Sequence, residues 1–309
     1  MLNTPVLFLI FKRLDTTMQV LEQIREAKPK KLYIAADGPR DEVAGEAEEC
    51  EKLRKAVLDR IDWDCEIVKL FREQNITAKI AISEAIDWFF EYEEEGIILE
   101  DDCVPDPTFF SFCEHLLEKY RDDSRVLHIS GCNLQFGQTY GDGSYYFSKH
   151  VNIWGWATWR RAWKHYDITM KSFPTFQEQN QMYNIMDKMH ARYTRRFAGV
   201  YDTQGGRHEW AYQWAYANLS QGGLAITPNK NLISNIGFGG SAETTLDSQN
   251  PLANLPTEPI EDIQHPTFML PFREADERFV KLTAARPSFF QQLRVFFKKH
   301  GNFGLGKKK

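Results

Sequence analysis

The segment Gly96-Ile97-Ile98-Leu99-Glu100-Asp101-Asp102 is a short apolar run that ends on three consecutive carboxylates. Its apolar residues, 97–99, are typical of a buried strand. A strand that ends in acidic side chains delivers them to the edge of a sheet, where open α/β sheets bind ligands. Three adjacent carboxylates repel one another, and carboxylate oxygens suit Mg²⁺ or Mn²⁺. The segment therefore indicates a cation site for a phosphate-bearing ligand, although an acidic turn that only faces solvent has the same pattern.

Strand-like and helix-like stretches alternate through the first half of the chain. The hydrophobic spacing predicts strands at 6–11, 31–36, 65–71, 97–99 and 125–130, separated by helices at 16–27, 46–60, 76–90 and 107–120. In the less regular second half it predicts a strand at 145–148, helices at 157–165, 182–197 and 209–220, and an irregular loop region at 250–271. This order predicts an α/β fold with a mixed, mostly parallel sheet and helices on both faces.

The composition is that of an ordinary globular protein, with 42% hydrophobic and 26% charged residues in a chain of 309. A formal net charge of −5 argues against a nucleic-acid-binding protein with a general basic surface. The five cysteines form no Cys-x-x-Cys pair, which favours reduced thiols in a cytoplasmic protein. The apolar run at 6–11 is too short for a signal sequence or a membrane span.

The end of the chain combines apolar residues at helical spacing with basic ones. Positions i, i+1, i+4, i+7 and i+8 are Phe289, Phe290, Leu293, Phe296 and Phe297, with Arg294, Lys298 and Lys299 between and after them. This pattern is typical of an amphipathic helix at a membrane surface, so we expect membrane contact through residues 288–309. A terminal helix that docks on the body of the protein would have the same spacing.

Polar side chains follow three other predicted strands, at Arg13, Asp37 and Arg72. In a doubly wound sheet they share an edge with the acidic triplet. Asp37 could accept hydrogen bonds from a base or ribose, and Arg13 or Arg72 could steady the base or a phosphate. Both common glycine-rich phosphate loops are missing from the sequence. We therefore expect a metal ion to neutralise the phosphates.

Several stretches resemble a known family. Residues 98–102, followed by Pro and Phe-Phe, resemble the Glu-Asp-Asp version of the Asp-x-Asp motif in GT-A glycosyltransferases, and this stretch is similar to N-acetylglucosaminyltransferases of the N-glycan pathway. Over roughly 4–272 the chain resembles a bacterial group of family-two-like nucleotide-diphospho-sugar transferases, the haemolysin-like group. The matching stretches are 5–11, 32–39, 62–65, 128–131, 153–163 and 231–239.

The resemblance implies a GT-A-like domain with a donor-binding half, 1–135, and an acceptor half, 136–272, followed by an amphipathic basic tail, 273–309. It implies a metal-dependent glycosyltransferase that moves a sugar from a nucleotide-diphosphate donor, with a UDP-sugar favoured, to a glycan or lipid-linked acceptor in bacterial surface polysaccharide synthesis. Mn²⁺ or Mg²⁺ would neutralise the departing diphosphate. We expect a cytoplasmic enzyme, placed at the inner membrane face if the tail binds lipid.

The resemblance also implies roles for individual residues. Asp102 matches the position that meets the metal directly. Glu100 and Asp101 would face the sugar and ribose or position the metal's waters, and Asp101 is included among the catalytic residues. Trp154 and Trp156 could form a wall for donor or acceptor, because aromatic faces stack on the C–H faces of sugars, although bulky aromatics also build cores.

The sequence departs from the family at the expected catalytic base. Relatives read Trp-Asp-Tyr-Gln-Trp where residues 210–214 have Ala211 in place of the aspartate. An inverting transferase needs a base, usually Asp or Glu. Glu209 is the preferred candidate and His208 the alternative, although on a helix Glu209 points about 200° away from position 211.

A second departure follows Gly239, where relatives tend to carry Thr-His-Thr and residues 242–245 contain no histidine. Glu243 could contact the metal instead, and His265 matches a His-Pro of relatives. These losses leave two further interpretations open. The chain could bind a nucleotide-sugar with weak or no turnover, or it could be a sugar nucleotidyltransferase. The latter is the weaker alternative because no glycine-rich basic loop follows the first strand.

Overall fold

The computed structural model describes residues 1–186, 190–203, 210–239 and 250–283. The strands are β1 Val6–Ile10, β2 Lys31–Ala36, β3 Glu66–Phe71, β4 Glu95–Glu100, β5 Cys103–Pro105, β6 Val126–Ser130, β7 Tyr145–Ser148, β8 Trp156–Trp159, β9 Leu224–Pro228 and β10 Ile233–Asn235. The helices are α1 Leu14–Ala27, α2 Glu46–Arg60, α3 Ala78–Tyr92, α4 Thr108–Lys119, α5 Arg160–Trp163, α6 Phe173–Glu178, α7 Gln181–Met186, α8 His190–Asp202, α9 Ala211–Ser220 and α10 Arg273–Thr283.

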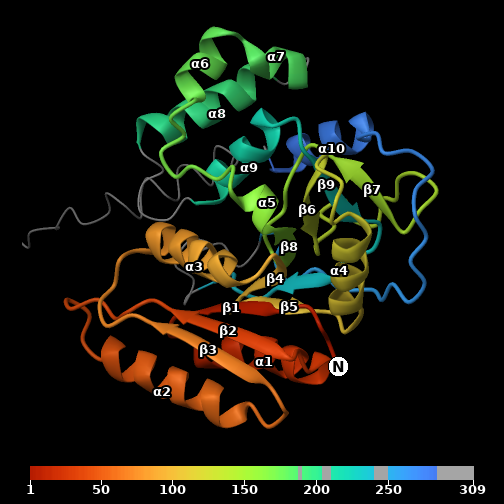
Figure 1. The fold of residues 1–309 in the computed structure, drawn as a ribbon. Coiled ribbons are helices and arrows are strands. Elements are labelled where there is room, and N and C mark those ends of the chain that lie inside the picture. Colours follow the sequence, from red (N-terminus) through yellow and green to blue (C-terminus); the bar gives the residue numbers. More distant parts are fainter. Residues whose placement is uncertain (187–189, 204–209, 240–249, 284–309) are drawn as a thin grey trace, which may run out of the picture.

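Eight of these strands form one sheet in the order β3-β2-β1-β4-β8-β6-β9-β7 (Figure 1). The pairs β3-β2, β2-β1, β1-β4 and β6-β9 are parallel, and the other three pairs are antiparallel. The strands β10 and β5 form a separate antiparallel pair. The predicted α/β fold with a mixed, mostly parallel sheet is therefore confirmed.

Helices cover both faces of the sheet because its strands are apolar on both sides. Along β1, Val6, Phe8 and Ile10 pack into one buried cluster, which also contains side chains of α1, α2 and α4. Leu7 and Leu9 point into a second cluster, with side chains of α3, α5 and α9. The two layers lie on opposite sides of the sheet in Figure 1.

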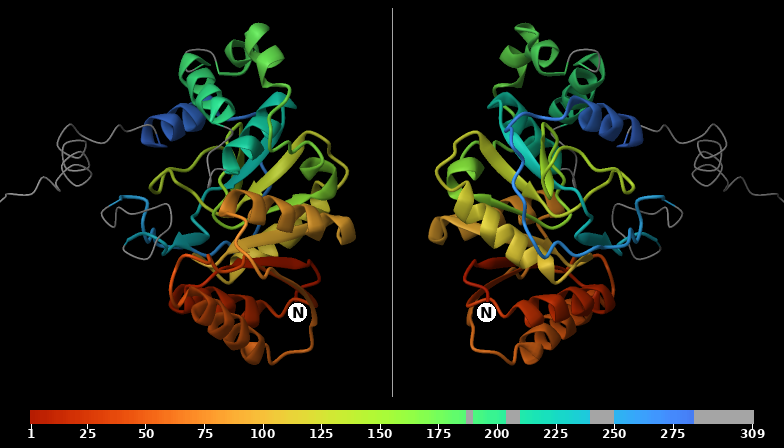
Figure 2. Two further views of the ribbon diagram at one scale, coloured as in Figure 1. Left: turned by 90° about the vertical axis from the view of Figure 1, so that its left-hand side faces the viewer. Right: turned by 90° about the vertical axis from the view of Figure 1, so that its right-hand side faces the viewer.

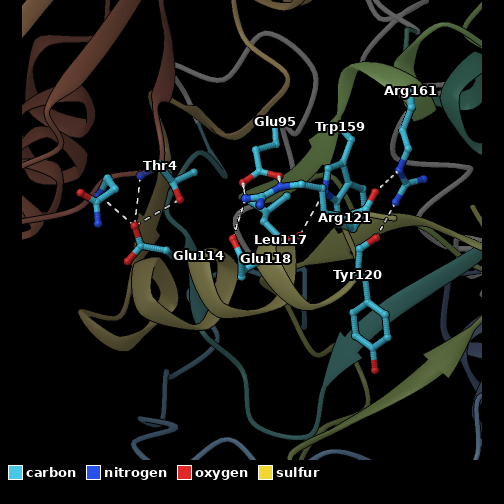
Figure 3. A network of polar contacts seen from close by, with 10 residues as sticks. Thr4, Glu95, Glu114, Leu117, Glu118, Tyr120, Arg121, Trp159 and Arg161 are labelled. Atoms are coloured by element: carbon cyan, nitrogen blue, oxygen red, sulfur yellow. Dashed lines mark hydrogen bonds and ion pairs between the residues drawn. The ribbon is translucent and has the colours of Figure 1, made fainter. Parts of the chain in front are cut away.

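A network of polar contacts fixes α4 against neighbouring segments (Figure 3). Glu114 accepts a hydrogen bond from the backbone N–H of Thr4, 3.1 Å away, just before β1. Beyond the C-terminal end of α4, the Arg161 guanidinium donates to the carbonyl oxygens of Tyr120, at 2.8 Å, and Arg121, at 2.7 Å. These carbonyls follow a helix that can no longer satisfy them internally. Arg161 therefore joins α4 to the β8-α5 segment.

The expected helix at 157–165 is wrong over its first half. Trp156–Trp159 form β8, and only Arg160–Trp163 are helical. The helical spacing of the tryptophans was misleading, because β8 pairs antiparallel with both β4 and β6 in the centre of the sheet. Pairing with two distant strands outweighed the local pattern.

A small helical layer, made of α6, α7 and α8, packs with α9 at one end of the molecule (top of Figure 1; Figure 2). The helix expected at 182–197 corresponds to two helices, α7 and α8, on either side of the undescribed residues 187–189. Helix α10, within the segment expected as a tail, docks on β7, where Asp276 accepts a 2.6 Å hydrogen bond from Ser148. Within the described ranges, no helix is long and apolar enough to cross a membrane.

Candidate functional site

The acidic triplet lies where β4 ends, as the sequence predicts. Glu100 is the last residue of β4, Asp101 and Asp102 form a turn, and β5 begins at Cys103. The turn is fixed from the opposite strand, because the N–H of Ile236 donates to the carbonyl of Asp102 at 2.9 Å. The pairing of β5 with β10 thus holds the carboxylates at the rim of the sheet.

Arg13, one of the predicted site residues, meets the triplet directly. It follows β1, and its guanidinium forms ion pairs with the carboxylates of Asp101 and Asp102, the latter at 2.8 Å. Burial alone would lower the pKa of Arg13, but the two aspartates raise it above its ordinary value, so the guanidinium stays charged. Burial is also the main cause that raises the pKa of Asp101, against the effect of Arg13.

The charges of this cluster do not balance. Three carboxylates and one guanidinium leave two negative charges when all the groups are ionised. Glu100 Oε1 and Asp101 Oδ2 are buried and have no hydrogen-bond partner among the described residues. Burial is the main cause that raises the pKa of Glu100, and the negative charges of Asp102 and Asp101 raise it further. A buried polar atom without a partner is costly, so the cluster fits an additional cation or donor.

No three His, Cys, Asp or Glu side chains converge in the described parts of the chain to form a complete protein metal site. That finding is compatible with Mg²⁺, which proteins hold through one or two carboxylates plus substrate phosphates and water rather than in all-protein cages. The residues present therefore fit an ion shared with a diphosphate. Asp102 is the candidate ligand.

Gly237 makes the close approach to Asp102 possible. A Cβ atom at position 237 would lie 1.9 Å from Asp102 Oδ2, far inside contact distance. The position is fixed by Asn235, whose Oδ1 accepts a 2.9 Å hydrogen bond from the Gly237 N–H. A glycine therefore lets the loop after β10 cross the acidic turn while the Asp102 carboxylate keeps this position.

Asp37 and Arg72 lie together at the ends of β2 and β3. The Arg54 guanidinium joins the two positions by donating to the carbonyls of Asp37, at 2.9 Å, and Arg72, at 2.7 Å. The Asp37 carboxylate accepts hydrogen bonds from the Asn75 amide at 2.9 Å and the Ile76 N–H at 3.2 Å. In this structure Asp37 thus orders the loop before α3, and its role toward a base or ribose stays a prediction.

The two predicted tryptophans have different environments. Gly155, with a φ of +60°, lies between them and turns the chain into β8. Trp156 is fully buried and stacks on His128, with ring centroids 5.1 Å apart. Trp154 is partly exposed and packs edge-on against Phe238, at 5.6 Å. Phe238 follows Gly237, which lies beside Asp102. Of the two tryptophans, Trp154 is therefore the one near the acidic triplet.

Trp154 also lines a cavity of about 320 Å³. Its walls come mainly from residues 149–154 and from α8, α9 and α10, with Cys132, Leu134 and Leu252 completing them, and Ala211 is among the lining residues. The position at which the resemblance predicts a base is therefore part of a cavity wall, although here it has no carboxylate. Asp37 and Arg72 do not line it. Glu209, His208 and residues 242–245 lie outside the described residues.

Two buried histidines border this region, and sequence reasoning singled out neither. His128 Nδ1 accepts a hydrogen bond from Trp214 Nε1 at 3.1 Å, and burial lowers the pKa of His128 to about 3. Its uncharged ring is therefore part of the core. His150 lines the cavity, and burial lowers its pKa to about 3 as well.

Sequence reasoning also missed Arg192 and Arg196, which line the same cavity. Their four-residue spacing is a visible signal of a shared helix face. However, basic pairs on helices usually face only solvent, so the spacing gave no reason to predict these two arginines as site residues. His265 forms a 2.9 Å hydrogen bond with the Tyr145 hydroxyl and stacks on His115, which indicates a structural role.

Comparisons with known proteins place these observations in context. No family model matches the chain, and no curated protein matches its sequence. Among solved structures, HddC from Yersinia pseudotuberculosis is 9% identical, with 51% of this chain and 77% of that chain covered and a TM-score of 0.31.

Two glycosyltransferase structures are similarly distant. The mannosyltransferase PcManGT from Pyrobaculum calidifontis, in complex with GDP-Man and Mn²⁺, is 10% identical, and the match covers 50% of this chain but only 44% of that one, with a TM-score of 0.33. Mouse xyloside xylosyltransferase 1, in its apo form, is 9% identical over 71% of this chain and 81% of that chain, with a TM-score of 0.35. At these values the comparisons assign no activity to the chain.

Proposed function

We propose that the chain is a GT-A-like glycosyltransferase that binds a nucleotide-diphosphate sugar, with UDP favoured, at the acidic triplet. The observation that carries this proposal is the pair Asp101 and Asp102 at the carboxyl end of β4. Gly237 lies against Asp102, and the next residue, Phe238, packs on Trp154, which lines the cavity. Such a rim is where α/β sheets place ligands. The cavity would then receive the acceptor, a glycan or a lipid-linked sugar of bacterial surface polysaccharide synthesis.

Mn²⁺ or Mg²⁺ would be held by Asp102, with Glu100 and Asp101 close by. When bound, the ion would neutralise the negative charge that develops on the departing diphosphate. Arg13 contributes a fixed positive charge to the same place and keeps both aspartates in position. Asp101, which is 5% exposed, holds its charge away from water and is proposed to orient the sugar or ribose.

In the proposed reaction, an acceptor oxygen forms a bond to the anomeric carbon while the bond from that carbon to the diphosphate oxygen breaks. The acceptor hydroxyl proton has to leave, and Glu209 is the proposed base. Trp154 borders both the triplet side and the cavity, so its ring is placed to pack against a sugar. The buried Trp156 would support this wall from the core.

The test of this proposal is donor binding by Asp102→Asn. We expect the wild-type protein to bind a UDP-sugar in the presence of Mn²⁺ and the variant to lose at least about tenfold in affinity, because one charged ligand is removed. Isothermal titration calorimetry, repeated with EDTA, measures both effects.

The control is Asp122→Asn, an exposed carboxylate on the segment after α4. It removes the same charge away from the site and should bind donor like the wild type. Equal donor affinity in Asp102→Asn and the control would contradict the proposal, as would binding that is unaffected by EDTA.

A second candidate function is donor binding without efficient transfer. It is favoured by one observation: the cavity wall carries Ala211 where relatives have an acid. Ala211→Asp separates the two functions, because a gain in transfer rate would show that the wild type lacks a base. If Glu209→Gln instead abolishes an existing activity, the wild type is an enzyme with a displaced base.

A further inference from the structure

The cavity beside Trp154 is lined by cations. Lys149, Arg192 and Arg196 are among its lining residues, and the described lining contains no aspartate or glutamate. This is unusual in a chain whose formal net charge is −5. A concave surface with one sign of charge concentrates ligands of the opposite sign. The cavity and the acidic triplet therefore favour ligands of opposite charge, although Trp154 connects them.

Arg196 is held at the wall by an aromatic ring rather than by an acid. Its guanidinium lies over the Tyr212 ring, 4.3 Å from the centroid. Among the described residues, no carboxylate forms an ion pair with Arg196. A guanidinium stacked in this way keeps its N–H donors available for a carboxylate or phosphate. Lys149 Nζ is fixed by a 2.5 Å hydrogen bond to the carbonyl of Ile185, and its charge is shared with the nearby Asp276 carboxylate.

Much of the remaining lining is apolar, and His150 adds a polar atom that is unpartnered within the described ranges. Side chains such as Ile153, Leu219 and Val280 form its walls. His150 is 5% exposed, its Nδ1 is 3.0 Å from the Tyr193 hydroxyl, and its Nε2 has no hydrogen-bond partner in the described structure. A buried polar atom of this kind is costly unless a ligand or water satisfies it.

We propose that this cavity binds the acceptor through an anionic group, a phosphate or a carboxylate carried on a body with apolar faces. Arg196, with Arg192 and Lys149, holds the anion, and the apolar walls cover the rest. His150 Nε2 supplies one further polar contact, as donor or acceptor according to the tautomer of its ring. This inference rests on the proposed function, and it names the chemical class of the acceptor.

The experiment measures binding of small anionic probes to the full chain by isothermal titration calorimetry, without donor and with EDTA. The probes are glucose 1-phosphate, glucuronic acid and octyl phosphate, and methyl glucoside is the neutral reference. We expect at least one anionic probe to bind and methyl glucoside to bind at least about tenfold more weakly, because a charge-assisted contact is lost. The first two probes distinguish a sugar phosphate from a sugar acid, and the third detects a lipid phosphate.

Two pairs of variants locate the binding. Arg196→Gln should weaken binding of the anion about tenfold. Arg195→Gln, on an exposed neighbouring position of α8 outside the cavity, should bind the anion within about twofold of the wild-type affinity.

The second pair tests the cavity itself. Ala215→Trp fills the cavity from α9 and should abolish binding, whereas Ala44→Trp, on an exposed loop, should bind like the wild type. Circular dichroism establishes that each variant is folded.

The inference is overturned if no anionic probe binds, if the neutral glycoside binds equally well, or if Arg195→Gln and Arg196→Gln behave alike. Binding that survives Ala215→Trp also overturns it, because the site would lie elsewhere. Failure of the proposed function is distinguishable, since it appears as a loss of Mn²⁺-dependent donor binding that these titrations do not involve. Donor binding without anion binding would leave the glycosyltransferase proposal standing and remove this inference.

Discussion

At the scale of single residues, the candidate site depends on positions that carry no functional group. Gly237 allows the loop after β10 to lie against the Asp102 carboxylate. Gly155 has a φ of +60°, and a Cβ atom there would lie 2.4 Å from Ile233 Cδ1. Both glycines bring segments that are far apart in the sequence into contact at the triplet. Their contribution is close approach, which larger side chains would prevent.

Gly237→Ala tests this directly. The new methyl group would overlap the carboxylate of Asp102, so either the side chain or the loop has to move. We expect a loss of about 1–3 kcal/mol in the free energy of unfolding, as for other overpacked positions, together with weaker Mn²⁺-dependent donor binding. Urea denaturation and calorimetry measure the two effects.

Gly199→Ala is the matched control. This glycine lies in α8, and nothing is within 4 Å of the Cβ atom that alanine would add. The control should gain about 0.5–1 kcal/mol, because alanine is the better helix former. Equal stability of the two variants would show that the loop has room beside Asp102.

At the scale of elements, the central connection is the junction of α4 with β8 and α5. Arg161 supplies three hydrogen bonds to backbone carbonyls, the third being to Val126 at 2.9 Å, at the start of β6. Its guanidinium also stacks on the Trp159 ring, 4.3 Å from the centroid. One side chain thus joins the end of a helix to two strands of the sheet.

Arg161→Ala should therefore destabilise the protein as a whole. It leaves three carbonyls without their charged donor, two of them in partly buried hydrogen bonds, and we expect a loss of about 2–4 kcal/mol in the free energy of unfolding. Thermal and urea denaturation followed by circular dichroism measure it. Arg195→Ala, which removes an exposed arginine from α8, should change stability by less than about 0.5 kcal/mol. A similarly small effect at Arg161 would contradict the capping role.

At the scale of the whole molecule, the sheet has a protected centre and an open edge. β1 lies between β2 and β4, and all five of its residues are buried. β3 is the last strand on its side, and none of its residues is fully buried (Figures 1 and 2). Backbone N–H groups on the outer side of an edge strand have no neighbouring strand to accept their hydrogen bonds.

Hydrogen exchange should report this difference. We expect amides in 66–71 to exchange at least about tenfold faster than those in 6–10, because the edge opens without disturbing the two buried clusters. Mass spectrometry of peptides covering the two strands measures the rates in the full chain. Equal protection of the two segments would mean that the outer edge of β3 is covered in solution.

Hydrophobic spacing along the chain was enough to predict the elements whose burial follows a local pattern. The bounds expected for β2, α2 and β7 agree with the structure, and the expected strand before the acidic triplet is present as β4. It also placed Arg13 and the triplet at one rim, because the carboxyl ends of parallel strands meet at the same edge. These results required only hydrophobic periodicity and the order of strands and helices.

Other features became visible only in the folded chain: Trp156–Trp159 form a strand, β5 pairs with β10, and Trp154 and Trp156 have different surroundings. The cation-lined cavity is likewise assembled from six separate segments. The physical reason is that strand pairing and cavity walls depend on contacts between residues far apart in the chain. Local spacing records which side of an element is buried, but it does not record against which partner.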